Sequence, residues 1–380
     1  MNYSPGRENS NMQSSSSMQG SRGLVVRTKN NKYKMLTMSK KKQSIQTSTK
    51  FRTNVCTSVY RYPAAFKTES GSVLPAIEIT YTVHGELTNT NKKVIWIVHA
   101  LTANSDPLEW WDGLVGSQKL FDPNEYTIVC ANNLGSCYGT TGPMSINPLT
   151  NVAYAEIFPL VTIRDMSRVL ELLRRHLGIE KIHLLIGGSM GGQVGLEWAI
   201  EQPELFENLV PIATNARHSA WGIAFNEAQR LALGSGVAGL VAARAIALLS
   251  YRGYAAYNAT QTDEDERIDF FRAASYQQYQ GEKLVKRFNS DSYYALSKAM
   301  DSHNVGRGRV SIKDALAKIK ARTLVVGISS DILFPVQEQQ LLAETIQDAS
   351  LAVIDSEYGH DGFLLEYNKL ERLLRKFLKK

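Results

Sequence analysis

Short apolar runs alternate with amphipathic stretches along the chain from about residue 52 onward. Runs rich in β-branched and aliphatic side chains predict strands buried on both faces: Ala76–Val83, Val94–Val98, Tyr126–Ala131, Ile182–Ile186, Leu209–Ile212, Thr323–Ile328 and Leu351–Ile354. Helical periodicity separates most of them, over Ile163–His176, Gln193–Glu201, Val336–Ile346 and Gly362–Lys379. This alternation predicts an α/β fold with a mostly parallel central sheet and helices on both faces.

The interval between Ile212 and Thr323 breaks this rhythm, because it contains no strong strand pattern. Only helical patterns occur there: Ala224–Leu233, Val237–Leu249, Glu264–Gln280 and Tyr293–Met300. We therefore expect residues 214–320 to form a helical lid inserted into an α/β core made of residues 52–213 and 321–380.

Residues 1–51 have a different composition, with the serine run Ser14–Ser17 and the lysine run Lys40–Lys42. Low hydrophobicity and one-sided charge predict a disordered, basic, Ser-rich tail. A solvated tail, or an upstream start before Met35 or Met38, is favoured over an organelle transit peptide of similar composition.

The net charge of +7 comes from the N-terminal end of the chain. Residues 1–52 hold eleven Lys or Arg and a single acid, Glu8, which gives +10, so the remaining 328 residues sum to −3. A mildly acidic body predicts no nucleic-acid partner. Binding of RNA or a membrane by the basic tail is the alternative.

Cysteine content and hydropathy bear on the compartment. Cys56, Cys130 and Cys137 are too few and too scattered for a disulfide framework or a zinc site, so we expect no metal and a reducing, cytoplasmic location. The longest apolar stretch, Val237–Leu249, is shorter than the roughly 18 residues of a membrane span. Arg244 also interrupts it, so no membrane association is expected.

A G-x-S-x-G pattern, Gly187–Gly191, lies between a predicted strand and a predicted helix. This is the setting of a nucleophile elbow, a strained turn that exposes a serine hydroxyl, here that of Ser189. The turn also directs the amide of the next residue, Met190, at a developing oxyanion. The loop after the strand Val94–Val98 predicts a second oxyanion donor, the amide of Leu101.

A serine needs a base, and that base needs an acid to orient it. His360 follows the last predicted strand within a glycine-containing turn, which predicts the base. Asp331 follows the preceding strand and is the expected acid. Asp355 is the alternative, but it lies too close to His360 in sequence to reach back comfortably.

Three further residues suggest a binding site for an amino acid, with one group for its carboxylate and one for its ammonium. Arg244 lies in an apolar helical run, and Tyr251 lies two turns later on about the same face, so together they would bind a substrate carboxylate. Arg244 extending to solvent at a helix edge is the alternative. Asp361 would bind an ammonium group; its alternative is an exposed turn carboxylate.

Five collinear strings resemble the homoserine O-acetyltransferase family across about residues 52–380: His99–Thr102, Ala131–Pro143, Gly187–Gly192, Ser219–Glu227 and Tyr358–Gly362. The resemblance implies an α/β-hydrolase fold, the triad Ser189, Asp331 and His360, and oxyanion donors Leu101 and Met190. It implies that Arg244, Tyr251 and Asp361 contact L-homoserine. It also implies a homodimer formed through the helical lid.

The expected reaction is ping-pong transfer of an acetyl group from acetyl-CoA, through acyl-Ser189, to the homoserine hydroxyl, as in methionine biosynthesis. Acetyl-CoA is then a co-substrate, and no tightly bound cofactor is expected. Succinyl-CoA as donor and serine as acceptor are alternatives within the family. Outside it, a serine esterase with the same triad and a non-catalytic binding protein remain.

Overall fold

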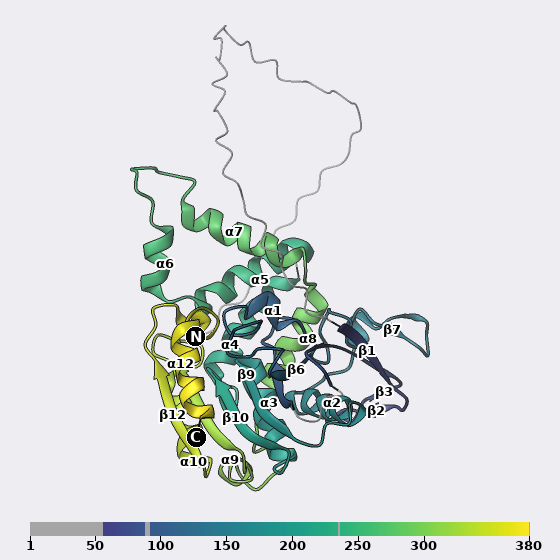
Figure 1. The fold of residues 1–380 in the computed structure, drawn as a ribbon. Helices are drawn as coiled ribbons and strands as arrows, with labels where there is room; N and C mark the ends of the chain where they lie inside the picture. Colours follow the sequence, from purple (N-terminus) through teal and green to yellow (C-terminus); the bar gives the residue numbers. More distant parts are fainter. Residues whose placement is uncertain (1–55, 88–91, 235, 380) are drawn as a thin grey trace, which may run out of the picture. The chain divides into compact units, whose positions relative to one another are not determined.

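The computed structural model describes residues 56–87, 92–234 and 236–379, and Figure 1 shows how they are arranged. These residues lie within one unit, Phe51–Lys380. The tail predicted for residues 1–51 lies outside the described residues.

An eight-stranded sheet runs through the middle of the described fold in the order β1-β4-β6-β5-β9-β10-β11-β12. The strands are β1 Cys56–Tyr62, β4 Ile77–His84, β5 Lys93–Val98, β6 Tyr126–Ala131, β9 Ile182–Gly188, β10 Phe206–Ile212, β11 Arg322–Ile328 and β12 Ala349–Ile354. β4 pairs antiparallel with β1 and β6, and the strands from β6 to β12 in this order pair in parallel. The predicted mostly parallel α/β sheet is confirmed.

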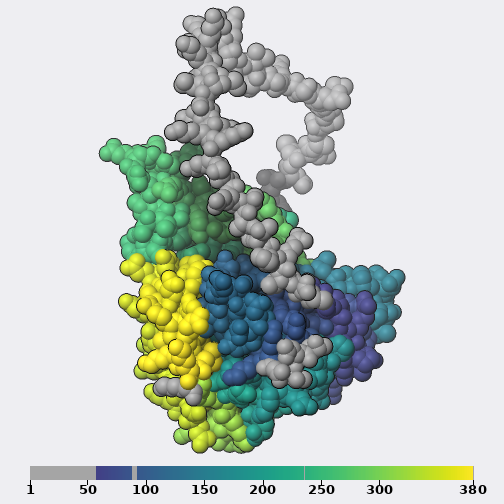
Figure 2. All heavy atoms as spheres, viewed as in Figure 1, coloured from purple at the N-terminus to yellow at the C-terminus, as the bar shows by residue number. Residues whose placement is uncertain are grey.

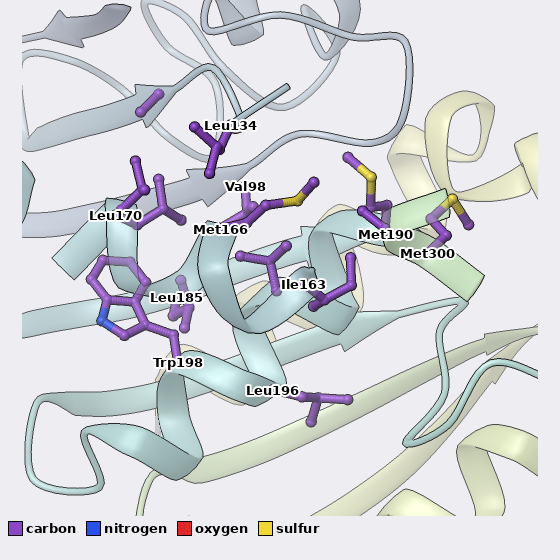
Figure 3. Close-up of a cluster of buried hydrophobic side chains, with 14 of the residues drawn as sticks. Val98, Leu134, Ile163, Met166, Leu170, Leu185, Met190, Leu196, Trp198 and Met300 are labelled. Atoms are coloured by element: carbon purple, nitrogen blue, oxygen red, sulfur yellow. The ribbon is translucent and has the colours of Figure 1, made fainter. Parts of the chain in front are cut away.

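Alternate residues of the central strands enter two separate hydrophobic clusters, so the sheet is buried on both faces. In β5, Trp96 joins the cluster on α2 (Ile163–His176) and α3 (Met190–Glu201), which Figure 3 shows from close by. Ile95 joins the second cluster, which includes Leu370 and Leu374 of α12. Helices therefore cover both faces, as the continuous apolar runs predict.

Most predicted core elements occur within a few residues of their expected bounds, and two differences have clear causes. The predicted C-terminal helix divides at Glu366 into α11 (Gly362–Leu365) and α12 (Tyr367–Leu378), because Glu366 has a non-helical ψ of 48°. β1 was not predicted, because it contains no continuous apolar run; it is an edge strand that pairing with β4 stabilises. α10 spans Val336–Thr345.

Several short elements complete the core. They are the strand pairs β2 (Phe66–Lys67) with β3 (Val73–Leu74) and β7 (Ile146–Asn147) with β8 (Val152–Ala153), the helix α1 (Pro107–Trp110), and the 3-10 turns η1 (Ala155–Ile157) and η2 (Gly359–Asp361).

The chain between β10 and β11 forms helices: α4 Ala220–Leu233, α5 Gly236–Tyr251, α6 Tyr254–Gln261, α7 Arg272–Val285, α8 Ser290–Asp301 and α9 Ile312–Leu316. The segment that carries α6 and α7, coloured green, projects from the rest of the described fold in Figures 1 and 2. The lid bounds 214–320 and the two core segments remain predictions.

One predicted helix in this segment, Glu264–Gln280, is wrong at its start, because α7 begins at Arg272. The preceding carboxylates bind nearby groups instead of continuing a helix. Asp263 accepts from the Arg272 amide, and Asp265 pairs with Arg267. Phe270 also has a positive φ of 58°.

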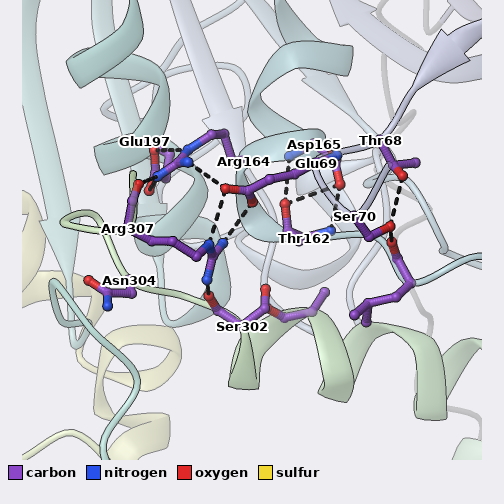
Figure 4. A network of polar contacts seen from close by, with 12 residues as sticks. Thr68, Glu69, Ser70, Thr162, Arg164, Asp165, Glu197, Ser302, Asn304 and Arg307 are labelled. Atoms are coloured by element: carbon purple, nitrogen blue, oxygen red, sulfur yellow. Dashed lines mark hydrogen bonds and ion pairs between the residues drawn. The ribbon is translucent and has the colours of Figure 1, made fainter. Parts of the chain in front are cut away.

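Buried ion pairs fix α3 to its surroundings (Figure 4). Glu197, whose side chain is 1% exposed, lies 3.2 Å from the Arg164 guanidinium of α2 and 2.8 Å from that of Arg309. Glu69 in turn contacts Arg164 and Arg307. Burial alone would raise the pKa of Glu197, but the hydrogen bonds and charges of Arg309 and Arg164 lower this pKa by more. The net pKa lies below the ordinary value for glutamate, so the carboxylate stays charged. α3 is thus held rigidly behind the turn at its N-terminus.

Candidate active site

Ser189 lies between the end of β9 and the start of α3 in a strained turn, with φ 58° and ψ −126°. The glycines around it allow a close backbone approach. A Cβ at Gly191 would lie 2.1 Å from the Val98 carbonyl oxygen of β5, and one at Gly187 would lie 2.5 Å from the Gly191 carbonyl oxygen. The predicted elbow geometry is present, and the strain at Ser189 is typical of functional turns.

His360, in η2 after β12, donates from Nδ1 to Asp331 Oδ2 across 2.6 Å. Asp331 is itself held in place, because its Oδ1 accepts from the amides of Leu333 at 2.8 Å and Phe334 at 2.9 Å. The exposed Asp355 accepts from Ser329 Oγ instead. The carboxylate that orients the imidazole is therefore that of Asp331, and Nε2 is left for a proton from a substrate or from Ser189.

Two opposing effects set the pKa of His360. Burial lowers this pKa, but the Asp331 carboxylate, through charge and its hydrogen bond, and the nearby Asp361 raise it more. The net pKa lies above the ordinary value for histidine. The imidazolium that forms during proton transfer is thus stabilised by two carboxylates.

The loop that carries Leu101 is fixed by a buried histidine that sequence reasoning did not single out. His99 Nε2 accepts from the Asn133 amide at 3.0 Å, so Nδ1 carries the proton and donates to the Ala100 carbonyl oxygen at 2.8 Å. Burial lowers the pKa of His99 to about 4, which keeps the ring neutral. The loop is thereby held in one conformation beside the Ser189 turn.

The amides of Leu101 and Met190 make no backbone hydrogen bond outside the helices and strands within the described part of the chain. Met190 is the first residue of α3, where amides have no acceptor within the helix. Leu101 lies in a turn, and among the described residues its amide makes no backbone hydrogen bond. Both amides are thus available for an oxyanion.

A cavity of about 390 Å³ joins these parts. Its lining includes the predicted residues Leu101, Ser189, Arg244, Tyr251, His360 and Asp361. The structure adds lining residues that were not predicted: Asn104, Glu109, Trp110, Lys283, Arg287, Phe363 and Leu364. Met190 is fully buried, and Asp331 lies behind His360.

Close backbone contacts between the end of α5 and the turn before His360 bring the side chains of Arg244 and Tyr251 near the His360 ring. Gly359, directly before His360, has a φ of 65°, and a Cβ there would lie 2.8 Å from the Tyr251 carbonyl oxygen. Gly253 approaches Glu357 more closely still, since a Cβ there would lie 2.0 Å from the Glu357 carbonyl oxygen. As a result the Tyr251 ring lies 5.7 Å from the His360 ring, and the Arg244 guanidinium lies 5.6 Å from the Tyr251 ring centre.

Charges inside the cavity are only partly paired. Arg244 is half-buried, lines the cavity and has no ion pair among the residues that the structure describes. Asp361, with a side chain 14% exposed, pairs through Oδ2 with Arg252 Nε at 3.0 Å. Burial raises the pKa of Asp361, and Arg252, Arg244 and His360 offset this only in part. Arg252 was not predicted, because its partner is distant in sequence.

No helix among the described residues is long and apolar enough to cross a membrane. Within residues 56–87, 92–234 and 236–379, no three His, Cys, Asp or Glu are grouped so that they would hold a metal ion.

Comparison with known proteins agrees with this geometry. Residues 93–367 match the family described as alpha/beta hydrolase fold. The homoserine O-acetyltransferase of Cyclobacterium marinum is 46% identical over 324 residues, which cover 82% of this chain and 92% of that protein. The crystal structure of homoserine O-acetyltransferase from Bacillus anthracis has a TM-score of 0.78 at 23% identity, covering 86% of this chain and 98% of that one.

The fold alone does not define the reaction. Esterase E22 aligns with a TM-score of 0.77 at 22% identity, covering 85% of this chain and all of its own. The sheet order and the strained serine turn define an α/β-hydrolase-fold protein. At 46% identity over most of its length, the chain belongs to the homoserine O-acetyltransferase family.

Proposed function

We propose that this protein transfers an acetyl group from acetyl-CoA to the side-chain hydroxyl of L-homoserine through an acyl-Ser189 intermediate. The observation that carries this proposal is the lining of the 390 Å³ cavity, in which Ser189 and His360 occur together with the cation Arg244 and the carboxylate Asp361. An amino acid has one group for each charge. A cavity built only for ester hydrolysis needs neither.

In the first half-reaction, His360 Nε2 takes the hydroxyl proton of Ser189 as Oγ attacks the thioester carbonyl carbon. The Leu101 and Met190 amides bind the oxyanion, and each such donor is worth about 10²–10³ in rate. When the carbon–sulfur bond breaks, the proton on His360 passes to the departing thiolate. Coenzyme A leaves as the free thiol, with Ser189 acetylated.

In the second half-reaction, homoserine occupies the same cavity. Arg244 with Tyr251 binds its carboxylate, and Asp361, whose Oδ2 pairs with Arg252, offers Oδ1 to its ammonium group. His360 takes the proton of the homoserine hydroxyl, which attacks the acyl ester. The tetrahedral intermediate then collapses with return of that proton to Ser189, and O-acetylhomoserine leaves.

Transfer competes with hydrolysis, and the acceptor's position decides the outcome. A bound homoserine hydroxyl has an effective concentration far above that of a diffusing nucleophile, and closure of the cavity by the helical segment limits water. The esterase alternative predicts rapid loss of acyl-Ser189 without any acceptor. The proposed transferase predicts slow loss until homoserine is added.

A donor–acceptor matrix tests the assignment. Acetyl-CoA and succinyl-CoA are each combined with homoserine and serine, and the products are identified by mass spectrometry. We expect O-acetylhomoserine to form fastest. Faster formation of a succinyl product or of a serine product would replace the proposed function by that alternative. Equal release of free acid in every mixture would favour an esterase.

The remaining assignments follow from this function. We propose that acetyl-CoA is a co-substrate and that no tightly bound cofactor or metal takes part. We also propose a cytoplasmic homodimer that binds neither nucleic acid nor a membrane. The exposed apolar residues of the projecting segment, among them Ile268 and Phe270 at 95% and 82% exposure, support an interface there.

A further inference from the structure

Two basic side chains, one from the last turn of α7 and one from the turn after it, lie at the entrance of the Ser189 cavity. Lys283 and Arg287 both line the 390 Å³ cavity and are both exposed to solvent. Lys283 lies in the last turn of α7 and Arg287 in the turn that follows the helix, and both side chains line the same two hollows. Gln280, one turn before Lys283, lines one of these hollows as well.

These side chains also line a second hollow of about 250 Å³ next to the first. The two hollows share Arg244, Lys283, Arg287, Asp361 and Leu364. A ligand extending outward from Ser189 would therefore pass between α7 and the turn at Asp361 into the second hollow.

The second hollow carries a strong excess of positive charge. Arg244, Arg252, Lys283 and Arg287 line it, against the single carboxylate of Asp361, which Arg252 already pairs. Lys283 has no ion pair within the described part of the chain, and Arg287 donates only to neutral oxygens, the Thr102 carbonyl and the Tyr138 hydroxyl. Cations left without counter-charges beside a substrate cavity are suited to a polyanion.

We propose that Lys283 and Arg287 form a binding site for the phosphate groups of the acyl donor, at its nucleotide end. This inference rests on the proposed function, because acyl-CoA is the donor there. The acyl thioester then reaches Ser189 through the inner cavity while the phosphates remain in the outer hollow. Arg287 supplies a guanidinium fork and Lys283 a flexible ammonium group.

Arg287 also contacts the loop that carries Leu101, so a variant of Lys283 tests the proposed phosphate site more specifically than a variant of Arg287. Its guanidinium donates to the carbonyl oxygen of Thr102, the residue after Leu101, and to Tyr138 Oη at 2.7 Å. Replacing Arg287 would therefore disturb the oxyanion loop as well as the entrance. Lys283→Gln removes a charge without touching that loop, and Lys286→Gln is its matched control, since Lys286 is exposed, ends the same helix and lines neither hollow.

The test compares two donors on the full-length protein. Acetyl-CoA carries phosphates, and S-acetyl-N-acetylcysteamine is a thioester without them. We expect Lys283→Gln to lower the ratio of kcat/KM for acetyl-CoA to kcat/KM for the short thioester by about tenfold, the effect of losing one charged contact. Lys286→Gln should change this ratio less than twofold. An equal change in both variants, or an equal loss with both donors, would overturn the proposal.

A binding measurement separates this site from the proposed reaction. Adenosine 3′,5′-bisphosphate, the nucleotide end of the donor, is titrated calorimetrically into the unaltered protein and both variants. We expect about tenfold weaker binding to Lys283→Gln and a steep loss of affinity with added salt. If the bisphosphate binds in this pattern but no acetyl transfer occurs, the proposed function fails and the site stands. If acetyl transfer occurs and Lys283→Gln binds the bisphosphate as tightly as Lys286→Gln does, the proposed phosphate site is wrong while the proposed function stands.

Discussion

The turns at the edge of the sheet and the helices between β10 and β11 supply different chemistry to one cavity. The sheet turns contribute Ser189, His360 and the Leu101 amide, each held by backbone contacts within the core. The helices contribute long side chains, among them Arg244 and Lys283, whose charges are only partly neutralised. We infer that the first region supplies the groups that make and break the acyl bond, whereas the second selects the donor and the acceptor.

Removing the serine should produce the largest effect and abolish both half-reactions. We expect Ser189→Ala to fold normally and to lose acyl transfer by about 10⁴-fold or more, because the other parts of the site cannot replace the nucleophile. Release of free coenzyme A from acetyl-CoA in a rapid-mixing experiment measures this loss. A normal burst of thiol from Ser189→Ala would show that another nucleophile acts.

Removing the charge of Arg244 should separate the two regions. We expect Arg244→Gln to lower kcat/KM for homoserine by about 30- to 100-fold, since a hydrogen bond between charged groups contributes about 2–3 kcal/mol. Acylation by p-nitrophenyl acetate, which has no carboxylate, should fall much less. Lys286→Gln, an exposed charge on α7, is the control. Equal losses in both half-reactions would mean that Arg244 supports the sheet edge and not the acceptor.

Asp361 lies where the two regions meet, so its replacement should affect both. The Asp361 carboxylate raises the pKa of His360, so Asp361→Asn should lower that pKa. The acylation rate increases with pH as His360 becomes neutral, and in the variant this increase should occur at lower pH. The pH profile of p-nitrophenyl acetate acylation measures the shift, and KM for homoserine should rise several-fold. A shift to higher pH would contradict the assigned charge interaction.

The smallest effect should come from loosening the contact between α5 and the His360 turn. A Cβ at Gly253 would lie 2.0 Å from the Glu357 carbonyl oxygen, so Gly253→Ala should cost about 2 kcal/mol of unfolding free energy. Gly234→Ala is the matched control, because nothing lies within 4 Å of a Cβ there. Chemical denaturation measures both. Similar stabilities would show that this contact does not hold the two regions together.

The same contrast explains what the sequence predicts well. The continuous apolar runs predicted the central strands, because residues buried on both faces leave a local signal that tertiary contacts do not override. The elbow was predictable because the close approach of Val98 demands a glycine at position 191. The position of Asp331 after β11 identified the partner of His360, and the hydrogen bond between them is present.

Other parts of the site left no local signal. Lys283 belongs to an amphipathic helix like many others, Arg287 lies in the turn after it, and only the packing of this segment places them at the cavity. Arg252 pairs with a carboxylate more than a hundred residues away. His99 lies inside a quoted motif, but its role depends on the Asn133 amide of another loop. Contacts between distant segments, not residue types, determine these features.

The central claim is that Ser189 holds an acetyl group that homoserine removes. Mixing the protein with acetyl-CoA alone, quenching with acid and analysing the peptides by mass spectrometry tests it directly. The account predicts one added acetyl group on Ser189, persisting in buffer and disappearing on addition of homoserine as O-acetylhomoserine forms. An unmodified Ser189, or an acetyl group lost to water as fast without homoserine as with it, would contradict the account.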